Sequence, residues 1–195
     1  PDAHDYPEGR MRGTRSIAVF PDYNPTCIHA DIFAPIAPGT DAALCLGMAK
    51  WAIDAGKHDI PYIKQFTDMP FLVRTDTGKL LRKDDRENKD GSPKNQAEFN
   101  TYYVWDNSTG QPVEAPGTLG SPNQTLDLGT IDPALQGTFI VKTGNGQGGL
   151  GSGVKGVKGK TQVRTVFDRL VDKLAPFTIA EVASITSLDA DLIVQ

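Results

Sequence analysis

The chain has 195 residues, of which 38% are hydrophobic and 23% charged, and this composition is typical of a globular protein. A net charge of −4 argues against a nucleic-acid partner, which needs a basic face, and no run of about 18 apolar residues predicts a membrane-spanning helix. Two cysteines are too few for a metal-ligand cluster or a disulfide framework. The first residue is Pro1 rather than Met, so we expect a piece of a longer protein.

Two short strands are predicted near the N-terminus. The apolar run at residues 17–20 is typical of a buried parallel strand, and Pro21 ends it by removing a backbone donor. Residues 32–36 form a second candidate strand, which Pro38 and Gly39 terminate. Polar residues therefore gather where two strands end, and open α/β sheets usually bind their ligands at such an edge.

An amphipathic helix follows these strands. An apolar stripe through residues 40–55 predicts the helix and indicates core packing, with Gly56 just past its end. Thr40 is suited to the N-cap position, and Asp41 places a negative charge near the helix N-terminus. Residues 59–66 predict a second, shorter helix.

The middle of the chain predicts extended segments separated by loops. Residues 69–74 are expected to be extended, with a turn at residues 75–78. Residues 82–97 are charged and poor in apolar side chains, so we expect an exposed loop there. Residues 102–105 and 111–114 flank the turn sequence DNSTG and predict a β-hairpin.

The C-terminal part is predicted to combine one strand with helices. Residues 138–142 predict a strand, and a glycine-rich stretch follows it. Apolar spacing over residues 163–174 predicts a helix. Thr178 and Glu181 form a capping box before a further helix, and residues 191–194 are strand-like.

Together these elements predict an α/β fold in three portions. Residues 1–81 form the α/β portion, and residues 82–160 form a loop-rich insertion that contains the hairpin and the glycine-rich loop. Residues 161–195 form a helical segment that returns to the α/β portion.

Two motifs resemble nucleotide-binding loops but lack the required context. Residues 144–149 match G-x-G-x-x-G after a strand, yet the glycines that follow cannot start the helix that this pattern requires. Gly159-Lys160-Thr161 resembles the end of a Walker A motif, but Val154 stands where its first glycine should be. We expect neither motif to bind a nucleotide, and the first predicts a surface loop.

The sequence predicts no self-sufficient catalytic cluster. Three histidines are isolated and lack metal-ligand spacing: His4, His29 and His58. His29 lies beside Asp31 between the two predicted strands, where a structural turn residue is expected and a hydrogen bond to a ligand is the alternative. Asp84 and Asp85 lie in the charged stretch, so we expect them to be exposed rather than to act in acid–base catalysis.

The remaining candidate site is the polar edge formed by residues 21–23 and 37–41. A carboxylate such as that of Asp22 accepts hydrogen bonds from ribose hydroxyls or a guanine edge. Amides at the helix start near Gly39 can approach a phosphate or a pterin closely, because glycine has no Cβ. From the residues alone, a nucleotide-type cofactor site and a purely structural corner both stay open.

At these positions the chain resembles the catalytic subunit of the nitrate reductase type, which consists of molybdenum enzymes of the dimethyl sulfoxide reductase family. The similar segments are residues 1–4, 13–15, 19–23, 30–31, 39–43, 67–82, 103–106, 126–127 and 132–137. The latter half is similar to the branch with nitrite oxidoreductases, archaeal-type nitrate reductases, and selenate, chlorate and perchlorate reductases. Ethylbenzene and dimethyl sulfide dehydrogenases belong to the same branch.

The resemblance implies a bis(molybdopterin guanine dinucleotide) molybdenum cofactor beside a Rossmann-like parallel sheet, with an irregular β-hairpin insertion. Pro21 and Asp22 fall where the family contacts the guanosine part of one pterin. Gly39 and Asp41 fall at the second contact loop, with Thr40 capping the helix there. The molybdenum ligand and the ligands of the iron–sulfur cluster belong to earlier segments of the family. We therefore expect an internal fragment that is inactive alone.

The implied reaction interconverts nitrate and nitrite by oxygen-atom transfer on a small oxyanion substrate. The implied partners are an iron–sulfur beta subunit and a haem-containing membrane or periplasmic subunit. A chlorate, perchlorate or selenate reductase, or a dehydrogenase of the same branch, is the alternative within this class. A non-catalytic nucleotide-binding module is the alternative outside it. Such complexes are membrane-associated on either the periplasmic or the cytoplasmic face, so the compartment stays open.

Overall fold

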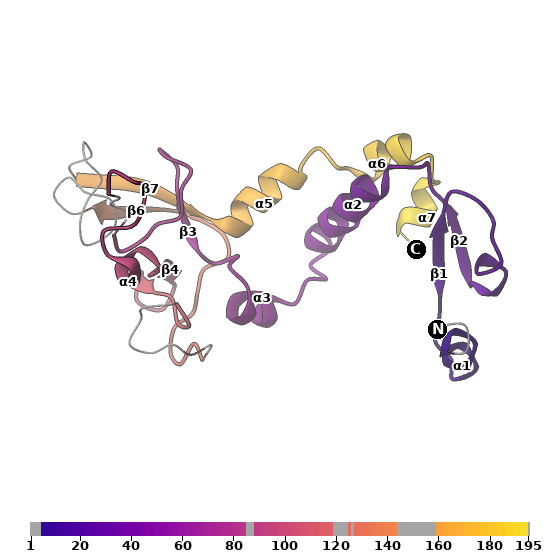
Figure 1. Cartoon of the computed structure of the whole chain (residues 1–195), viewed down its shortest axis with the longest axis horizontal. Helices are drawn as coiled ribbons and strands as arrows, with labels where there is room; N and C mark the ends of the chain where they lie inside the picture. The colour runs from indigo at the N-terminus through magenta and orange to yellow at the C-terminus, as the bar shows by residue number, and fades with distance from the viewer. Residues whose placement is uncertain (1–4, 85–87, 119–124, 126, 144–158, 195) are drawn as a thin grey trace. The chain divides into compact units, whose positions relative to one another are not determined.

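The computed structural model describes residues 5–84, 88–118, 125, 127–143 and 159–194, and the chain divides into two compact units. Unit 1 comprises Pro1–His58 and Lys173–Gln195, and unit 2 comprises Asp59–Asp172 (Figure 1). Among the described helices, none is both long enough and apolar enough to cross a bilayer.

Unit 1 contains a two-stranded parallel sheet. Strand β1 (Ile17–Phe20) pairs with β2 (Ile32–Pro35), and Figure 1 shows the two strands side by side. Helix α1 (Asp5–Met11) precedes β1, and the short 3-10 helix η1 (Cys27–His29) lies in the connection between the strands. Both predicted strands are confirmed, but the predicted burial of the first strand is wrong, because only Ala18 of its four residues is buried.

Helix α2 (Asp41–Asp54) follows β2 and ends as the sequence predicts. The amide of Gly56 donates to the carbonyl of Ile53 at 3.0 Å, and the amide of Lys57 donates to that of Ala52 at 2.8 Å. These two bonds form a Schellman motif, which needs the left-handed conformation that Gly56 adopts with φ of 62°. The predicted position of Gly56 just past the helix is confirmed.

The core of unit 1 joins segments that are far apart in the sequence. Ala34 and Leu44 pack in one cluster with Val182 of helix α6 (Ile179–Thr186). Gly47 brings α2 so close to α6 that an added Cβ would lie 2.5 Å from Cγ2 of Val182. The C-terminal segment is therefore needed to cover the helix that follows β2.

The two C-terminal helices begin at local hydrogen bonds. The hydroxyl oxygen of Thr178 accepts a bond from the amide of Glu181 at 3.2 Å, which confirms the predicted N-cap of α6. The last segment is helix α7 (Ala190–Val194), so its strand-like prediction is wrong. The carboxylate of Asp189 accepts a bond from the amide of Asp191 at 2.8 Å, and this bond favours a helical start over an extended chain.

The apolar stripe of α2 is only partly buried, which differs from the predicted core packing. Leu44 is buried, whereas Met48 is 54% exposed and Trp51 is 37% exposed. These two side chains border an apolar groove in unit 1.

Unit 2 is built on a three-stranded antiparallel sheet in the order β3-β7-β6. The strands are β3 (Leu72–Arg74), β6 (Thr138–Thr143) and β7 (Gly159–Thr165). Its helices are α3 (Ile60–Phe66), α4 (Gln96–Phe99) and the start of α5 (Val166–Leu174). The predicted short helix after residue 59 and the predicted strand near residues 138–142 are both confirmed.

Strand β7 was not predicted, and the helix expected from residue 163 begins only at Val166. Thr161, Val163 and Thr165 are buried, while Gln162 between them is exposed, and this alternation is that of a strand. The apolar residues from Val163 onward also fit a helical spacing, so the sequence did not indicate where the strand ends and the helix begins.

A hairpin formed by β4 (Tyr103–Asp106) and β5 (Gln111–Glu114) confirms the predicted pairing. The carboxylate of Asp106 accepts bonds from the amide of Ser108 at 3.1 Å and the hydroxyl of Thr109 at 2.8 Å. It also accepts the amide of Asp132 at 2.9 Å, so one side chain holds the turn and a distant loop together.

The charged stretch after residue 82 is less exposed than predicted. Asp84 is only 1% exposed, so the expectation of an exposed carboxylate is wrong. The amide of Lys83 donates to the carbonyl of Thr101 at 3.0 Å, and the amide of Asp84 donates to that of Glu98 at 3.3 Å. These bonds join the stretch to the segment around α4, which the local charge pattern did not indicate.

The described chain is therefore a mixed α/β structure with small sheets, which confirms the predicted fold class at this level. The glycine-rich motif at residues 144–149 lies outside the described residues.

Candidate functional site

The carboxyl ends of β1 and β2 lie at the same edge of the parallel sheet. Phe20 is paired with Pro35, and the carbonyl of Phe20 accepts a hydrogen bond from the amide of Ile36 at 3.2 Å. The segments that leave the two strands, residues 21–22 and 37–41, therefore start side by side. The two segments contain all five predicted site residues, and the structure places the first residues of these segments next to each other.

The second of these segments turns sharply before α2. The amide of Ala37 donates to the carbonyl of Thr186 at 2.9 Å, and the amide of Thr40 donates to that of Ala37 at 3.3 Å. Gly39 has φ of 80°, and a Cβ placed there would meet no atom within 4 Å. Glycine is therefore required by the backbone conformation, and the space beside it is open to a ligand.

Thr40 occupies the N-cap position of α2 but does not cap the helix with its side chain. Its hydroxyl donates to the carbonyl of Ala37 at 2.7 Å instead of accepting a bond from a helix amide, so the predicted cap is wrong. Among the described residues, the amides of Asp41 and Ala42 have no hydrogen-bond acceptor. The positive end of α2 is therefore free to interact with an anionic group.

Asp22 and Asp41 supply two exposed carboxylates at this edge. Neither forms an ion pair within the part of the chain that the structure describes. Pro21 is also exposed, and the carbonyl of Asp22 is 3.9 Å from the thiol Sγ of buried Cys27. The two segments that leave β1 and β2 therefore offer carboxylate acceptors and amide donors.

His29 and Asp31 lie in the connection between the two strands. The exposed His29 belongs to η1, and its carbonyl accepts a long 3.5 Å bond from the hydroxyl of Ser16. Asp31 accepts the amide of Ser16 at 2.7 Å and Arg10 at 3.1 Å, and these contacts hold the pKa of its carboxyl below the ordinary value. Asp31 therefore fixes the start of β1, which is a structural role.

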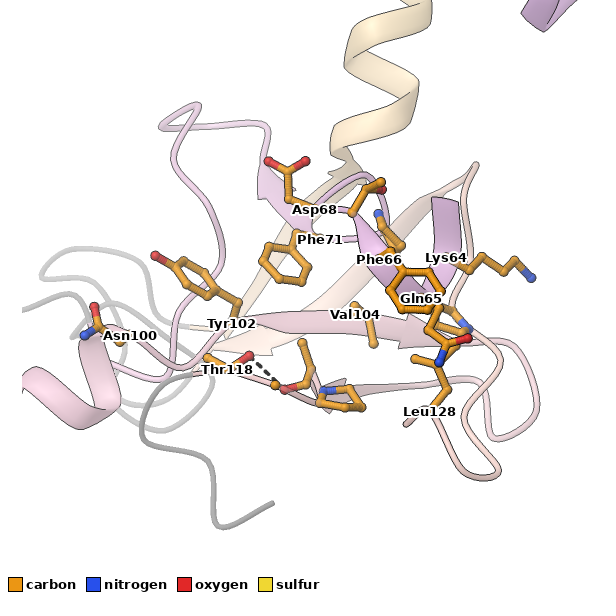
Figure 2. Close-up of a pocket in the computed structure, with 16 residues that line it drawn as sticks. Lys64, Gln65, Phe66, Asp68, Phe71, Asn100, Tyr102, Val104, Thr118 and Leu128 are labelled. Atoms are coloured by element: carbon orange, nitrogen blue, oxygen red, sulfur yellow. Dashed lines mark hydrogen bonds between the residues drawn. The ribbon is translucent and has the colours of Figure 1, made fainter. Parts of the chain in front are cut away.

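Unit 2 contains a separate cavity of about 490 Å³ that sequence reasoning missed (Figure 2). Phe71 and Tyr102 form part of its wall, with their rings stacked at 5.2 Å. Lys64 points outward in the figure, and its ammonium pairs with Asp132 at 2.5 Å. Residues from several distant segments line this cavity, so no local motif could have indicated it.

The described residues hold no group of three or more His, Cys, Asp or Glu side chains placed to bind a metal ion. The arrangement at the sheet edge can bind and orient a polar ligand through its carboxylates and free helix amides.

Comparison with known proteins decides the family, although no family model matches the chain. It is 40% identical over 196 residues to the chlorate reductase subunit alpha of Ideonella dechloratans, covering 100% of this chain and 19% of that protein. It is 37% identical over 188 residues to the dimethylsulfide dehydrogenase subunit alpha of Rhodovulum sulfidophilum, covering 96% of this chain and 18% of that protein. The chain belongs to the family of molybdopterin oxidoreductase alpha subunits.

A third member of this molybdopterin oxidoreductase family is the respiratory nitrate reductase subunit alpha of Haloferax mediterranei. It is 37% identical over 180 residues, which cover 90% of this chain and 17% of that protein. The chain thus spans about one fifth of the length of these relatives. The resemblance noted in the sequence is confirmed, and the names of these relatives cover chlorate, dimethylsulfide and nitrate without singling out one substrate.

Proposed function

We propose that the chain holds part of the molybdenum cofactor in the catalytic subunit of an oxidoreductase that interconverts nitrate and nitrite. The observation that supports this is the sheet edge, where the exposed Asp22 and Asp41 follow two paired strands beside the free amides of α2. In this proposal the cofactor is bis(molybdopterin guanine dinucleotide), and Pro21, Asp22, Gly39, Thr40 and Asp41 contact it.

The residues present fit the nucleotide part of such a cofactor. Carboxylates such as that of Asp22 accept hydrogen bonds from the N–H groups of a guanine edge or from ribose hydroxyls. The free amides of Asp41 and Ala42 suit a phosphate oxygen, since the helix N-terminus carries partial positive charge. Both the hydroxyl and the amide of Thr40 donate to the carbonyl of Ala37, so Thr40 offers the ligand only the acceptor lone pairs of its hydroxyl oxygen.

The cofactor supplies the oxygen-atom transfer when it is bound, and this chain binds and orients it. As part of the same proposal, β1 and β2 belong to a Rossmann-like parallel sheet. The chain then consists of an α/β portion (residues 1–81), a loop-rich insertion (82–160) and a helical segment that returns to the α/β portion (161–195). An iron–sulfur cluster is held outside this chain, and electrons pass to an iron–sulfur beta subunit and a haem-containing subunit.

The substrate has one alternative that a specific observation favours. The chain is 40% identical to a chlorate reductase subunit and 37% identical to a nitrate reductase subunit. These identities support chlorate as a substrate as strongly as they support nitrate. A perchlorate or selenate reductase or a dehydrogenase belongs to the same alternative. Membership of this family favours all of these over a separate nucleotide-binding module.

Replacing either carboxylate in the full-length subunit tests the cofactor contact. We expect Asp22→Ala and Asp41→Ala each to lower the bound guanine nucleotide at least about 10-fold. The physical reason is that a hydrogen bond to a charged group contributes about 1.5–3 kcal/mol. Guanosine monophosphate released by acid hydrolysis is measured by chromatography and divided by the amount of subunit.

Asp54→Ala is the matched control, because Asp54 lies at the other end of α2 and, within the described part of the chain, pairs only with Lys50, at 2.6 Å. Its nucleotide content should equal that of the wild type. A normal content in both Asp22→Ala and Asp41→Ala would show that this edge does not hold the nucleotide.

A further inference from the structure

Strand β6 forms a free edge of the three-stranded sheet in unit 2. The sheet has the order β3-β7-β6, so β6 pairs with β7 on one side only (Figure 1). The carbonyl of Gln162 in β7 accepts a bond from the amide of Thr75 at 3.0 Å and therefore points toward the β3 side. Ile140 is the partner of Gln162 in β6, so the alternation of an antiparallel ladder turns its amide and carbonyl away from β7. Lys142, two residues further on, has the same orientation.

The backbone groups along this edge suit another polypeptide strand. Among the described residues, none bonds to the outward amide or carbonyl of Ile140 or of Lys142. These four groups alternate between donor and acceptor along the strand, and a second extended backbone can satisfy all of them in register. A lipid surface offers no such ladder. The edge of β6 is therefore a template for the addition of a strand.

The side chains on the outer face of this edge are cationic and apolar. Lys142 and Lys160 are direct cross-strand partners, and both are exposed. Like charges placed opposite each other destabilise a sheet. Ile140 lies on the same face and is 63% exposed. This face therefore gains stability from a neighbour that supplies both carboxylates and an apolar side chain.

The surrounding residues do not neutralise the two lysines. Arg164 lies on the same face and pairs with Asp172 at 2.5 Å. Within the part of the chain that the structure describes, neither Lys142 nor Lys160 forms an ion pair. Residues 133–167 contain no Asp or Glu, so a neutralising carboxylate has to come from outside this segment.

The charge of the edge favours a separate chain as the source of the added strand. An edge lysine by itself often serves only to prevent unwanted pairing, but that role needs no large apolar side chain such as the exposed Ile140. Complementary charge between two chains speeds their encounter and selects the correct partner. Segments of one chain are already joined by the backbone and gain less from such selection.

We propose that an extended acidic segment of a partner subunit adds to the free edge of β6 as a further strand. Its backbone bonds to the amides and carbonyls of Ile140 and Lys142. Its carboxylates lie beside Lys142 and Lys160, and an apolar side chain two positions away covers Ile140. This proposal rests on the multi-subunit assembly of the proposed function but on none of its cofactor contacts, so it can fail while the nucleotide measurement succeeds.

Hydrogen exchange of the full-length subunit, alone and in complex with its partner subunits, tests the pairing. The amides of Phe139 and Val141 face β7 and serve as internal controls that are slow in both states. We expect the amides of Ile140 and Lys142 to exchange at least about 100-fold more slowly in the complex than in the free subunit. Protection already present in the free subunit would assign the edge to a strand of the same subunit. That result, or no protection in either state, would overturn the proposal.

Charge reversal tests the recognition by an independent readout. We expect Lys142→Glu combined with Lys160→Glu to raise the Kd of the subunit complex at least about 10-fold, because the attraction becomes a repulsion. The reversed pair keeps its mutual repulsion, so the stability of the sheet itself should not change. Lys79→Glu combined with Lys94→Glu is the matched control, since both lysines are exposed in unit 2 and form no ion pair among the described residues. Equal Kd values of the two double variants would overturn the proposal.

Two further measurements separate the acidic strand from other occupants. The Kd of the wild-type complex should rise at least about 5-fold between about 50 and 500 mM NaCl, and that of the reversed variant should rise less. An equal salt dependence of the two would contradict recognition by charge. Binding of the free wild-type subunit, but not of the reversed variant, to phosphatidylglycerol vesicles would assign the lysines to a membrane surface and overturn the proposal.

Discussion

Gly47 sets the distance between two helices of unit 1. A Cβ at this position would lie 2.5 Å from Cγ2 and 3.1 Å from Cγ1 of Val182, which is fully buried. A glycine inside a helix costs about 0.5–1 kcal/mol relative to alanine, so helix propensity alone disfavours it. The close contact with Val182 explains why the residue fits, and no pattern near Gly47 in the sequence indicated its partner.

Gly47→Ala is expected to destabilise unit 1 by about 1 kcal/mol, since an overpacking cost of about 1–3 kcal/mol exceeds the gain in helix propensity. Urea unfolding followed by Trp51 fluorescence, with Trp105 replaced by Phe, measures the change. Adding Val182→Ala makes room for the new methyl group. The double variant should therefore lose less free energy of unfolding than the sum of the losses of the two single variants. An increase in stability of Gly47→Ala alone would contradict this account.

Several elements could be predicted because their signals are local. The apolar run of β1, the Gly56 terminus of α2 and the DNSTG turn each lie within a few residues and determine one conformation. Strand β7 could not be predicted, because its burial depends on pairing with β3 and β6, which are distant in the sequence. The burial of Asp84 likewise depends on the segment around α4.

At the candidate site, too, only the features with a local sequence signal could be predicted. The Pro-Gly-Thr-Asp sequence before α2 indicated a turn into a helix start, and the structure has that turn. The hydroxyl of Thr40 could not be assigned from the sequence, because its bond to Ala37 depends on the conformation of that turn. The cavity beside Phe71 and Tyr102 gave no local signal at all.

The hairpin of β4 and β5 should depend on pH through Asp106. Hydrogen bonds from Ser108 and from the amide of Asp132 place the pKa of the Asp106 carboxyl well below its ordinary value. A carboxyl with a lowered folded pKa stabilises the fold above its unfolded pKa of about 4 and loses that contribution as pH falls toward the folded pKa. The stabilisation is therefore complete at neutral pH and declines in acid.

Asp106→Asn should lower the thermal midpoint at pH 7 and weaken its fall between pH 6 and pH 3, because the amide cannot gain the bonds of the charged form. Circular dichroism melts of the chain measure both effects. Asp127→Asn is the control, since Asp127 is exposed and, among the described residues, accepts only the amide of Gly129, at 2.9 Å. An identical pH dependence of Asp106→Asn and wild type would contradict the assignment.

At the scale of the whole molecule, this chain holds about one fifth of what its relatives contain. The sheet edge offers acceptors and donors to a ligand. If the proposed function holds, this chain binds the cofactor, and we expect substrate selection to be made by other parts of the subunit.

Asp22→Ala in the full-length subunit should lower nitrate and chlorate reduction together, in proportion to the molybdenum that remains bound. Activity per molybdenum and the ratio of kcat/KM for the two oxyanions should stay within about 2-fold of wild type, because equal losses leave no differential free energy. Metal analysis and steady-state rates of the same preparation give both numbers. A ratio altered more than about 10-fold would mean that this edge shapes the substrate site.

The hydrogen bond from Ala37 to Thr186 also has a consequence for the order of synthesis. The turn that carries Gly39 and Asp41 is tied to a carbonyl that the ribosome adds roughly 150 residues later. At about 5–20 residues per second, the turn waits roughly 7–30 s for this partner while all of unit 2 is made. The sheet edge of a nascent chain is thus completed late, and under the proposed function a cofactor that needs this edge is inserted after this part of the chain has been translated.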